Sequence, residues 1–198
     1  MKNSYGAINK SIDSLVKLNN SNRFQKSSTF SDSIVRIPVV FHIVHNNGPE
    51  NISKAQIESQ IQILNEDYRR IPGTSGFGNG VDTQFEFFLA QKDPMGHCTD
   101  GIIRIQSSET IHDIFNEASL KGLSQWDPVR YLNFWVVDQI LIFGFPGVLG
   151  YATVPQQLQG APNLDGVVVA DDFVGNQGTS GTPPFGFGRT GTHEVGHW

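Results

Sequence analysis

Cysteine is nearly absent from this 198-residue sequence: Cys98 is the only one, so no disulfide bond can form within it. The thiol either pairs with a partner outside these residues or stays buried and reduced, and the sequence leaves both alternatives open. Positive charge is also scarce, because 14 Lys and Arg face 19 Asp and Glu for a net charge of −5. The chain therefore lacks the basic footprint of a nucleic-acid-binding protein.

Long hydrophobic runs are missing as well. No apolar run approaches the roughly 18 residues that would indicate a membrane span. Residues 1–33 are rich in Ser, Asn and Lys, and their few large apolar residues bury too little surface to offset the entropy of ordering. We expect this segment to be a disordered tail or the remnant of a pro-segment. It has no unbroken apolar core of the kind found in signal peptides, so the signal of an exported protein would lie upstream.

Apolar patterning begins at residue 34, and we expect residues 34–198 to form one domain. The β-branched and aromatic stretch IVRIPVVFHIVH (34–45) predicts a buried strand. ISKAQIESQIQILNEDYRRI (52–71) predicts a helix capped by Ser53 and stopped by Pro72. Apolar residues at three- and four-residue spacing mark the inward face of this helix: Ile57, Ile61, Leu64 and Tyr68.

The rest of the chain alternates between strand and helix patterns. Further strands are predicted at 83–91, 101–106, 131–140, 149–155 and 165–171. A second helix is predicted at 109–121, with these residues facing inward: Ile111, Ile114, Phe115 and Ala118. A strand, a helix, several strands and a last helix predict an α/β sandwich with a mixed sheet. The order of the strands in the sheet does not follow from the pattern.

The chemistry of the chain is concentrated in its last residues, GTHEVGHW (191–198), where His193, Glu194 and His197 form the pattern H-E-x-x-H. On a helix, two histidines four positions apart project from one face and converge on a single ion. Zinc suits such a pair, because it accepts neutral imidazole nitrogens and leaves a position open for water. Glu194 lies about 100° around the helix from His193, so it is free to act as a general base toward that water. Without a metal, the same residues would be the polar start of a solvated helix. Against that alternative, Gly191-Thr192 precedes the motif as loop and possible cap, and Val195 and Trp198 would face the core.

None of the other histidines is a strong candidate for a third metal ligand. His42 and His45 have odd spacing on a strand and point to opposite faces, so we expect them to be hydrogen-bonded structural residues. His97 lies in a loop beside Cys98, and His112 is expected at the surface near the start of a helix. We therefore expect the third ligand beyond residue 198.

HEVGHW is preceded by several distinctive segments, in this order: RIPVVFHIVH, QIQILNEDYRR, GIIRI, YLNFWVVD, LGYATVP and DGVVV. Together with HEVGHW, this series resembles the pappalysin-type (cytophagalysin) branch of the metzincin metallopeptidases. The resemblance covers about residues 34–198. It implies an N-terminal subdomain in which a twisted mixed sheet and a backing helix support the active-site helix. Metzincins extend the motif to H-E-x-x-H-x-x-G-x-x-H and add a Met-turn. Both would follow Trp198, so we expect the catalytic domain to be incomplete here and these residues alone to be inactive.

The resemblance also implies that an antiparallel edge strand binds an extended peptide substrate through backbone hydrogen bonds. LGYATVP is the candidate, and Gly150, Tyr151 and Ala152 are its expected substrate-binding residues, since Gly150 and Ala152 leave room for another backbone. Some relatives bind calcium in addition to zinc, and the candidates for its oxygen ligands are Asp165, Asp171 and Asp172. Relatives of this kind are secreted, and their partners are protein or peptide substrates.

Three functions remain in competition. The first is a secreted zinc endopeptidase, with Glu194 as general base and His193 and His197 as metal ligands. The second is a non-catalytic domain that keeps the fold and binds protein in the cleft; an intact Glu194 argues against it, because such a domain needs no general base. The third, a β-rich module that binds carbohydrate or matrix, leaves HEVGH without a role.

Overall fold

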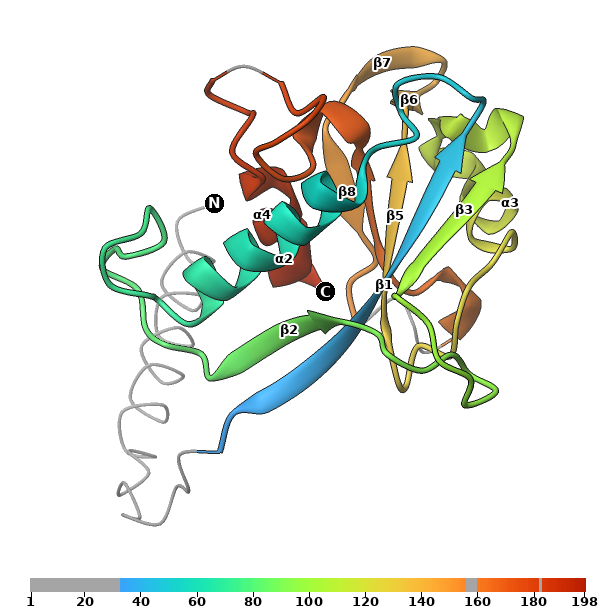
Figure 1. Ribbon diagram of the computed structural model, residues 1–198. Coiled ribbons are helices and arrows are strands. Elements are labelled where there is room, and N and C mark those ends of the chain that lie inside the picture. The colour runs from blue at the N-terminus through green and yellow to red at the C-terminus, as the bar shows by residue number, and fades with distance from the viewer. Residues whose placement is uncertain (1–32, 156–159, 182) are drawn as a thin grey trace, which may run out of the picture. The chain divides into compact units, whose positions relative to one another are not determined.

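The longest strand, β1 (Val35–His45), is an interior strand of the main sheet (Figure 1). The computed structural model describes residues 33–155, 160–181 and 183–198. β1 pairs in parallel with β2 (Phe85–Leu89) along its first half and with β3 (Ile102–Gln106) along its second half. The last seven residues of β1 are all buried, as its continuous apolar composition predicted.

The main sheet has the order β2-β1-β5-β9-β8, with β3 also paired to β1. β5 (Leu132–Val137) and β9 (Val167–Ala170) continue the parallel arrangement. β8 (Gly150–Ala152) closes this side of the sheet and runs antiparallel to β9. The predicted mixed sheet is confirmed, and the segment LGYATVP supplies its antiparallel edge strand.

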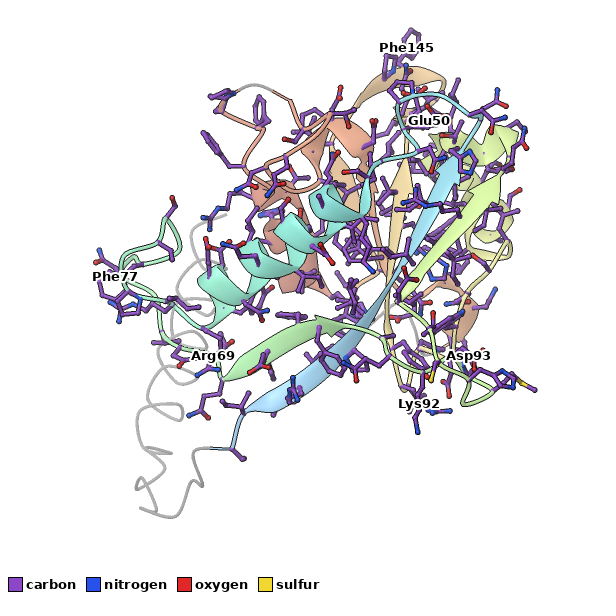
Figure 2. All side chains as sticks on the ribbon, in the orientation of Figure 1. Glu50, Arg69, Phe77, Lys92, Asp93 and Phe145 are labelled. Carbon is purple, nitrogen blue, oxygen red and sulfur yellow. The ribbon has the colours of Figure 1, made fainter. Side chains whose placement is uncertain are left out.

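A second, three-stranded sheet extends the first, in the order β4-β6-β7. β6 (Gln139–Ile142) follows β5 after a single residue, and β7 (Phe145–Val148) precedes β8 by a single residue. Two strands of the main sheet thus continue into the smaller sheet, where β6 and β7 pair with each other. Phe145 projects outward from β7 and is 76% exposed (Figure 2). β7 has no counterpart among the strands predicted from the sequence.

Helices cover both faces of the main sheet (Figure 1). α2 (Lys54–Tyr68) and α4 (Arg189–His197) pack on one face, where Ile57, Leu64 and Val195 join the larger hydrophobic core. α3 (Glu117–Lys121) packs on the other face, where Leu120 contributes to a second core around Trp135. Because β5 alternates its side chains, Phe134 and Val136 enter the first core while Trp135 and Val137 enter the second.

The helix predicted over 52–71 is α2: its predicted start at the Ser53 cap is confirmed, but it ends earlier than predicted. The side chain of Ser53 accepts a hydrogen bond from the backbone N–H of Gln56, as expected of an N-cap. The helix ends at Tyr68 instead of near Pro72, and Arg70 takes a left-handed conformation with φ 48°.

The prediction of a helix over 109–121 is wrong for most of its length. That segment forms a 3-10 turn (Ser108–Thr110), β4 (Ile111–Asp113), a second 3-10 turn (Ile114–Asn116) and only then α3. Asp113 breaks the helix, because its side chain accepts from the N–H of Phe115 and caps the second turn instead. Ile111 and Phe115, expected to face inward, are 52% and 62% exposed.

Residues 34–198 form one compact unit. The predicted tail, residues 1–33, lies outside the described residues except for Ser33. Within the described part of the chain, no helix has the length and apolar character to cross a membrane.

Candidate metal centre

α4 begins differently from the prediction. Its N-cap is Gly188, which has φ 66° and no side-chain cap, so Gly191 and Thr192 lie inside the helix instead of in a preceding loop. Left-handed φ favours glycine at this position. A Cβ on Gly188 would also come within 2.7 Å of Ile63 on α2. The helix therefore starts where a glycine allows the chain to turn tightly against α2.

His193 and His197 converge as the four-residue spacing predicted. Their Nε2 atoms are 3.0 Å apart, and the two rings stand nearly perpendicular, at 88°. Two nitrogen ligands of a tetrahedral zinc ion lie roughly 3.3 Å apart. Both side chains are exposed, so an ion and a substrate can reach them. The pair therefore fits two positions of one zinc site.

Glu194 lies beside the two histidines but is buried, at 8% exposure. Burial raises the pKa of its carboxyl group, while the neighbouring imidazoles of His193 and His197 act in the opposite direction. The carboxylate lines a cleft of about 370 Å³ between α4, the start of β8 and the loop at Phe185. A buried carboxylate next to a pair of imidazoles is a suitable acceptor for the proton of a water molecule.

β8 approaches α4 closely because it has small residues on that face. A Cβ on Gly150 would lie 3.0 Å from Cγ of Glu194 and 3.1 Å from Cγ2 of Thr190. Ala152 packs into the same core as α4, whereas Tyr151 points to the opposite face of the sheet. Of the three predicted substrate-binding residues, Gly150 and Ala152 thus lie on the side of the candidate metal centre, and Tyr151 does not.

A buried polar network holds the other face of β8. The hydroxyl of Tyr151 lies 2.9 Å from Nε2 of His112, which is fully buried on β4. His112 was expected at the surface, and this prediction is wrong because the segment forms a strand. The ammonium group of Lys121 donates to Thr153 at 2.8 Å and to Glu117 and the Leu164 carbonyl. Burial lowers the pKa of Lys121, and the Glu117 carboxylate opposes that shift.

The end of α4 is tied to the start of β9. Nε1 of Trp198 donates to both carboxylate oxygens of Asp165, at 2.9 and 3.1 Å. Asp165 precedes β9, whereas Asp171 and Asp172 follow it, so the three predicted calcium ligands lie at opposite ends of one strand. They do not form one site, and a calcium ion at any of them stays a prediction.

The remaining histidines have structural partners. His42 is buried between Ser124 and the Asn133 side chain, at 2.8 and 2.9 Å, and burial lowers its pKa to about 3. His45 accepts from the N–H of Asn47, and His97 contacts Asp93. In the described ranges, no group of three or more His, Cys, Asp or Glu side chains is placed to hold a metal ion. The expectation that His42 and His45 are hydrogen-bonded strand residues is confirmed.

Cys98 is free and exposed in the loop that follows β2, so the alternative of a buried thiol is wrong. The polar contacts between α2 and α4, made by Gln60, Asp67 and Tyr68, were not predicted from the sequence. A signal was present: Gln56 and Gln60 interrupt the apolar face of α2 and are fully buried, which requires polar partners from another segment.

Comparison with known proteins identifies metalloproteases. No family model matches the sequence. Mature mirolysin of Tannerella forsythia in complex with a cleaved peptide is 41% identical to the chain, with a TM-score of 0.73, over 84% of this chain and 63% of that one. A promirolysin mutant of the same organism is 36% identical, with a TM-score of 0.73, over 100% of this chain and 64% of the other. Extracellular metalloprotease 1 of Coccidioides posadasii (strain C735) is 26% identical over 182 residues, which are 88% of this chain and 55% of that protein.

The chain thus spans about 55% of the curated relative and about 63% of mature mirolysin. These homologues are metalloproteases, and mirolysin is a metzincin. The observed twisted mixed sheet with few helices matches the fold of mirolysin. The chain has the metzincin fold of mirolysin.

Proposed function

We propose that the protein is a secreted zinc-dependent endopeptidase of the pappalysin branch, and that residues 34–198 are the N-terminal subdomain of its catalytic domain. The observation that carries this proposal is the pair of imidazole Nε2 atoms 3.0 Å apart on α4. A buried glutamate adjoins the pair, and a sheet edge lies next to the glutamate. The metalloprotease relatives support the same assignment.

Each residue of the centre has a proposed role. His193 and His197 would bind zinc through Nε2. Zinc supplies a Lewis acid that polarises a peptide carbonyl and lowers the pKa of water. Glu194 accepts the proton of the attacking water and passes it to the leaving amine. The third protein ligand would follow Trp198, as the extended metzincin motif implies, and the 198 residues alone would then be inactive.

The substrate would be a protein or peptide segment in extended conformation. Gly150 and Ala152 present little side chain toward the metal centre, so a second backbone can lie along β8 and exchange hydrogen bonds with it. Mirolysin, to which this chain is similar, has been solved in complex with a cleaved peptide. That complex supports the proposal that a peptide binds in the corresponding cleft here.

The Glu194→Gln variant of the full-length protein tests the role of the general base. The amide has nearly the same shape but does not accept the proton of water, so hydrolysis of casein should fall by about 10²–10⁴-fold. Zinc content, measured by mass spectrometry of the metal, should stay at the wild-type level. Glu58→Gln, at an exposed position of α2, is the matched control and should leave both quantities unchanged.

Near-normal turnover in Glu194→Gln would exclude Glu194 as the base. A wild-type protein with stoichiometric zinc that hydrolyses neither casein nor peptide libraries would support the non-catalytic alternative. A wild-type protein without bound zinc would overturn the metal centre itself.

A further inference from the structure

One face of α2 carries polar side chains that contact the metal-binding helix. Gln60 and Asp67 are seven positions apart, which brings them to within about 20° of the same direction, and Tyr68 is the next residue. All three reach the N-terminal half of α4. We call these contacts between Gln60, Asp67 and Tyr68 of α2 and residues 188–192 the α2–α4 seam.

Thr192 is held at two points of the seam. Its hydroxyl donates to Oδ2 of Asp67 at 2.7 Å, and its carbonyl oxygen accepts from the hydroxyl of Tyr68 at 3.2 Å. Thr192 directly precedes His193. The seam therefore fixes both the side chain and the backbone of the residue next to a proposed metal ligand.

The seam also fixes the first turn of α4. Nε2 of Gln60 donates to the carbonyl of Gly188 at 3.0 Å, while its Oε1 accepts from the N–H of Gly175 at 2.8 Å. Arg189 forms an ion pair with Asp67. A Cβ on Gly191 would lie 2.8 Å from the carboxamide of Gln60, so the two helices are in close contact here. A shift of α4 along or around its axis would break several of these contacts at once.

α4 needs such support from outside. Its N-cap, Gly188, offers no side chain to the first N–H groups of the helix, so the first turn depends on contacts from other segments. The carboxylate of Asp67 lies near the N-terminal part of the helix, where negative charge is favourable to the helix dipole. The two histidines, by contrast, are exposed, and in the described part of the chain the ring contact that is found for each of them is with the other.

We propose that Asp67 and Tyr68 are positioning residues of the metal centre. By holding Thr192, they orient His193 relative to His197 and so determine how long a metal ion is retained. The inference rests on the proposed zinc site but concerns residues that do not touch the metal. Groups that orient metal ligands from behind typically change metal affinity by about 10–100-fold when they are mutated.

The test uses the full-length protein and two substitutions that each remove one hydroxyl group of the seam, Tyr68→Phe and Thr192→Val, alone and combined. The release of zinc to a chromophoric chelator measures retention. The visible spectrum of the cobalt(II)-substituted protein reports ligand geometry. Tyr131→Phe is the matched control, because its hydroxyl also donates to a backbone carbonyl, that of Lys92 at 3.0 Å, away from α4.

We expect each seam variant to release zinc on the order of tenfold faster than the wild type, with an altered cobalt spectrum. Tyr131→Phe should show the wild-type rate and spectrum even if its metal-free form unfolds at a lower temperature. The positioning role would be overturned if the double variant and Tyr131→Phe had the same rate and spectrum.

His193→Ala separates this inference from the proposed function. If wild type and His193→Ala bind zinc equally, the metal centre fails and the inference fails with it. If the wild type binds zinc tightly and His193→Ala does not, the metal centre stands. If the seam variants then retain zinc as well as the wild type does, the positioning role alone is wrong.

Discussion

Asp171 is the buried carboxyl group whose environment opposes its charge most clearly. It lies at the end of β9 and is 4% exposed. Burial raises its pKa to about 7, and the carboxylates of Asp172, Asp138 and Glu50 add to the effect. Since the folded-state pKa lies above the unfolded value, the contribution of this group to stability is fully present below about pH 4. It is lost as the pH rises toward 7.

We therefore predict that Asp171→Asn stabilises the protein at alkaline but not at acidic pH. At pH 4 the two proteins should unfold at the same urea concentration. At pH 8 the variant should be more stable by about 2 kcal/mol, after allowance for solvent screening. Urea titrations across this range provide the measurement, and parallel curves for the two proteins would contradict the prediction.

The difference between what the sequence predicts and what it does not is clear at the scale of single residues. The convergence of His193 and His197 was predicted because helical geometry alone determines how residues four positions apart project. The burial of Lys121 had no such local signal. Its partners Thr153 and Leu164 are 32 and 43 positions away, and only the assembled sheet brings them together.

At the scale of elements, β8 depends on the ion pair behind it. The Lys121 ammonium joins α3 to the residue after β8 and to the turn before β9. Its side chain is 0% exposed, and that of its partner Glu117 is 22% exposed. Replacing Lys121 would leave the half-buried carboxylate of Glu117 without its partner and would empty the space that the lysine side chain fills.

We expect Lys121→Ala to lower the free energy of unfolding by about 3–5 kcal/mol. The backbone amides of β8 should also exchange faster with deuterium, since the strand loses its support. Lys54→Ala is a suitable control. Its ion pair with Asp100, at 3.4 Å, has side chains 52% and 54% exposed, and its loss should cost less than about 1 kcal/mol. A similar small loss in Lys121→Ala would show that the network does not support the strand.

Element boundaries were predicted best where one periodicity dominates. The continuous apolar stretch of β1 and the three-and-four spacing of α2 gave both elements nearly their observed bounds. The segment 109–121 has apolar residues at helical spacing too, but the pairing of β4 with β6 overrides it. That pairing is a tertiary interaction, and it has no counterpart in the local pattern.

For the molecule as a whole, the pattern predicted the mixed sheet and its helical layers but not the strand order. The order β2-β1-β5-β9-β8 requires β9 to insert between β5 and β8, although β8 precedes it in the chain. Hydrophobic periodicity tells which residues are buried and not which strand lies next to which.

A bound metal ion should stabilise the whole domain and not only the site. A ligand that binds only the folded state stabilises it by about 2.7 kcal/mol at a concentration 100 times its dissociation constant. In the full-length protein, EDTA should therefore lower the melting temperature, and added zinc should restore it. His193→Ala and His197→Ala should melt at the temperature of the metal-free wild type, with or without EDTA. Equal sensitivity of these variants to EDTA would place the stabilising ion elsewhere.

The α2–α4 seam has a consequence for the order of events during biosynthesis. Tyr68 and Asp67 meet Thr192 across 124 and 125 positions of sequence. While a ribosome is still producing the intervening strands, α2 exists without the helix that it will hold. His193 and His197 can therefore acquire their fixed geometry only after the strands that lie between α2 and α4 in the sequence have emerged and folded. The part of the nascent chain that emerges first would therefore lack the convergent histidine pair.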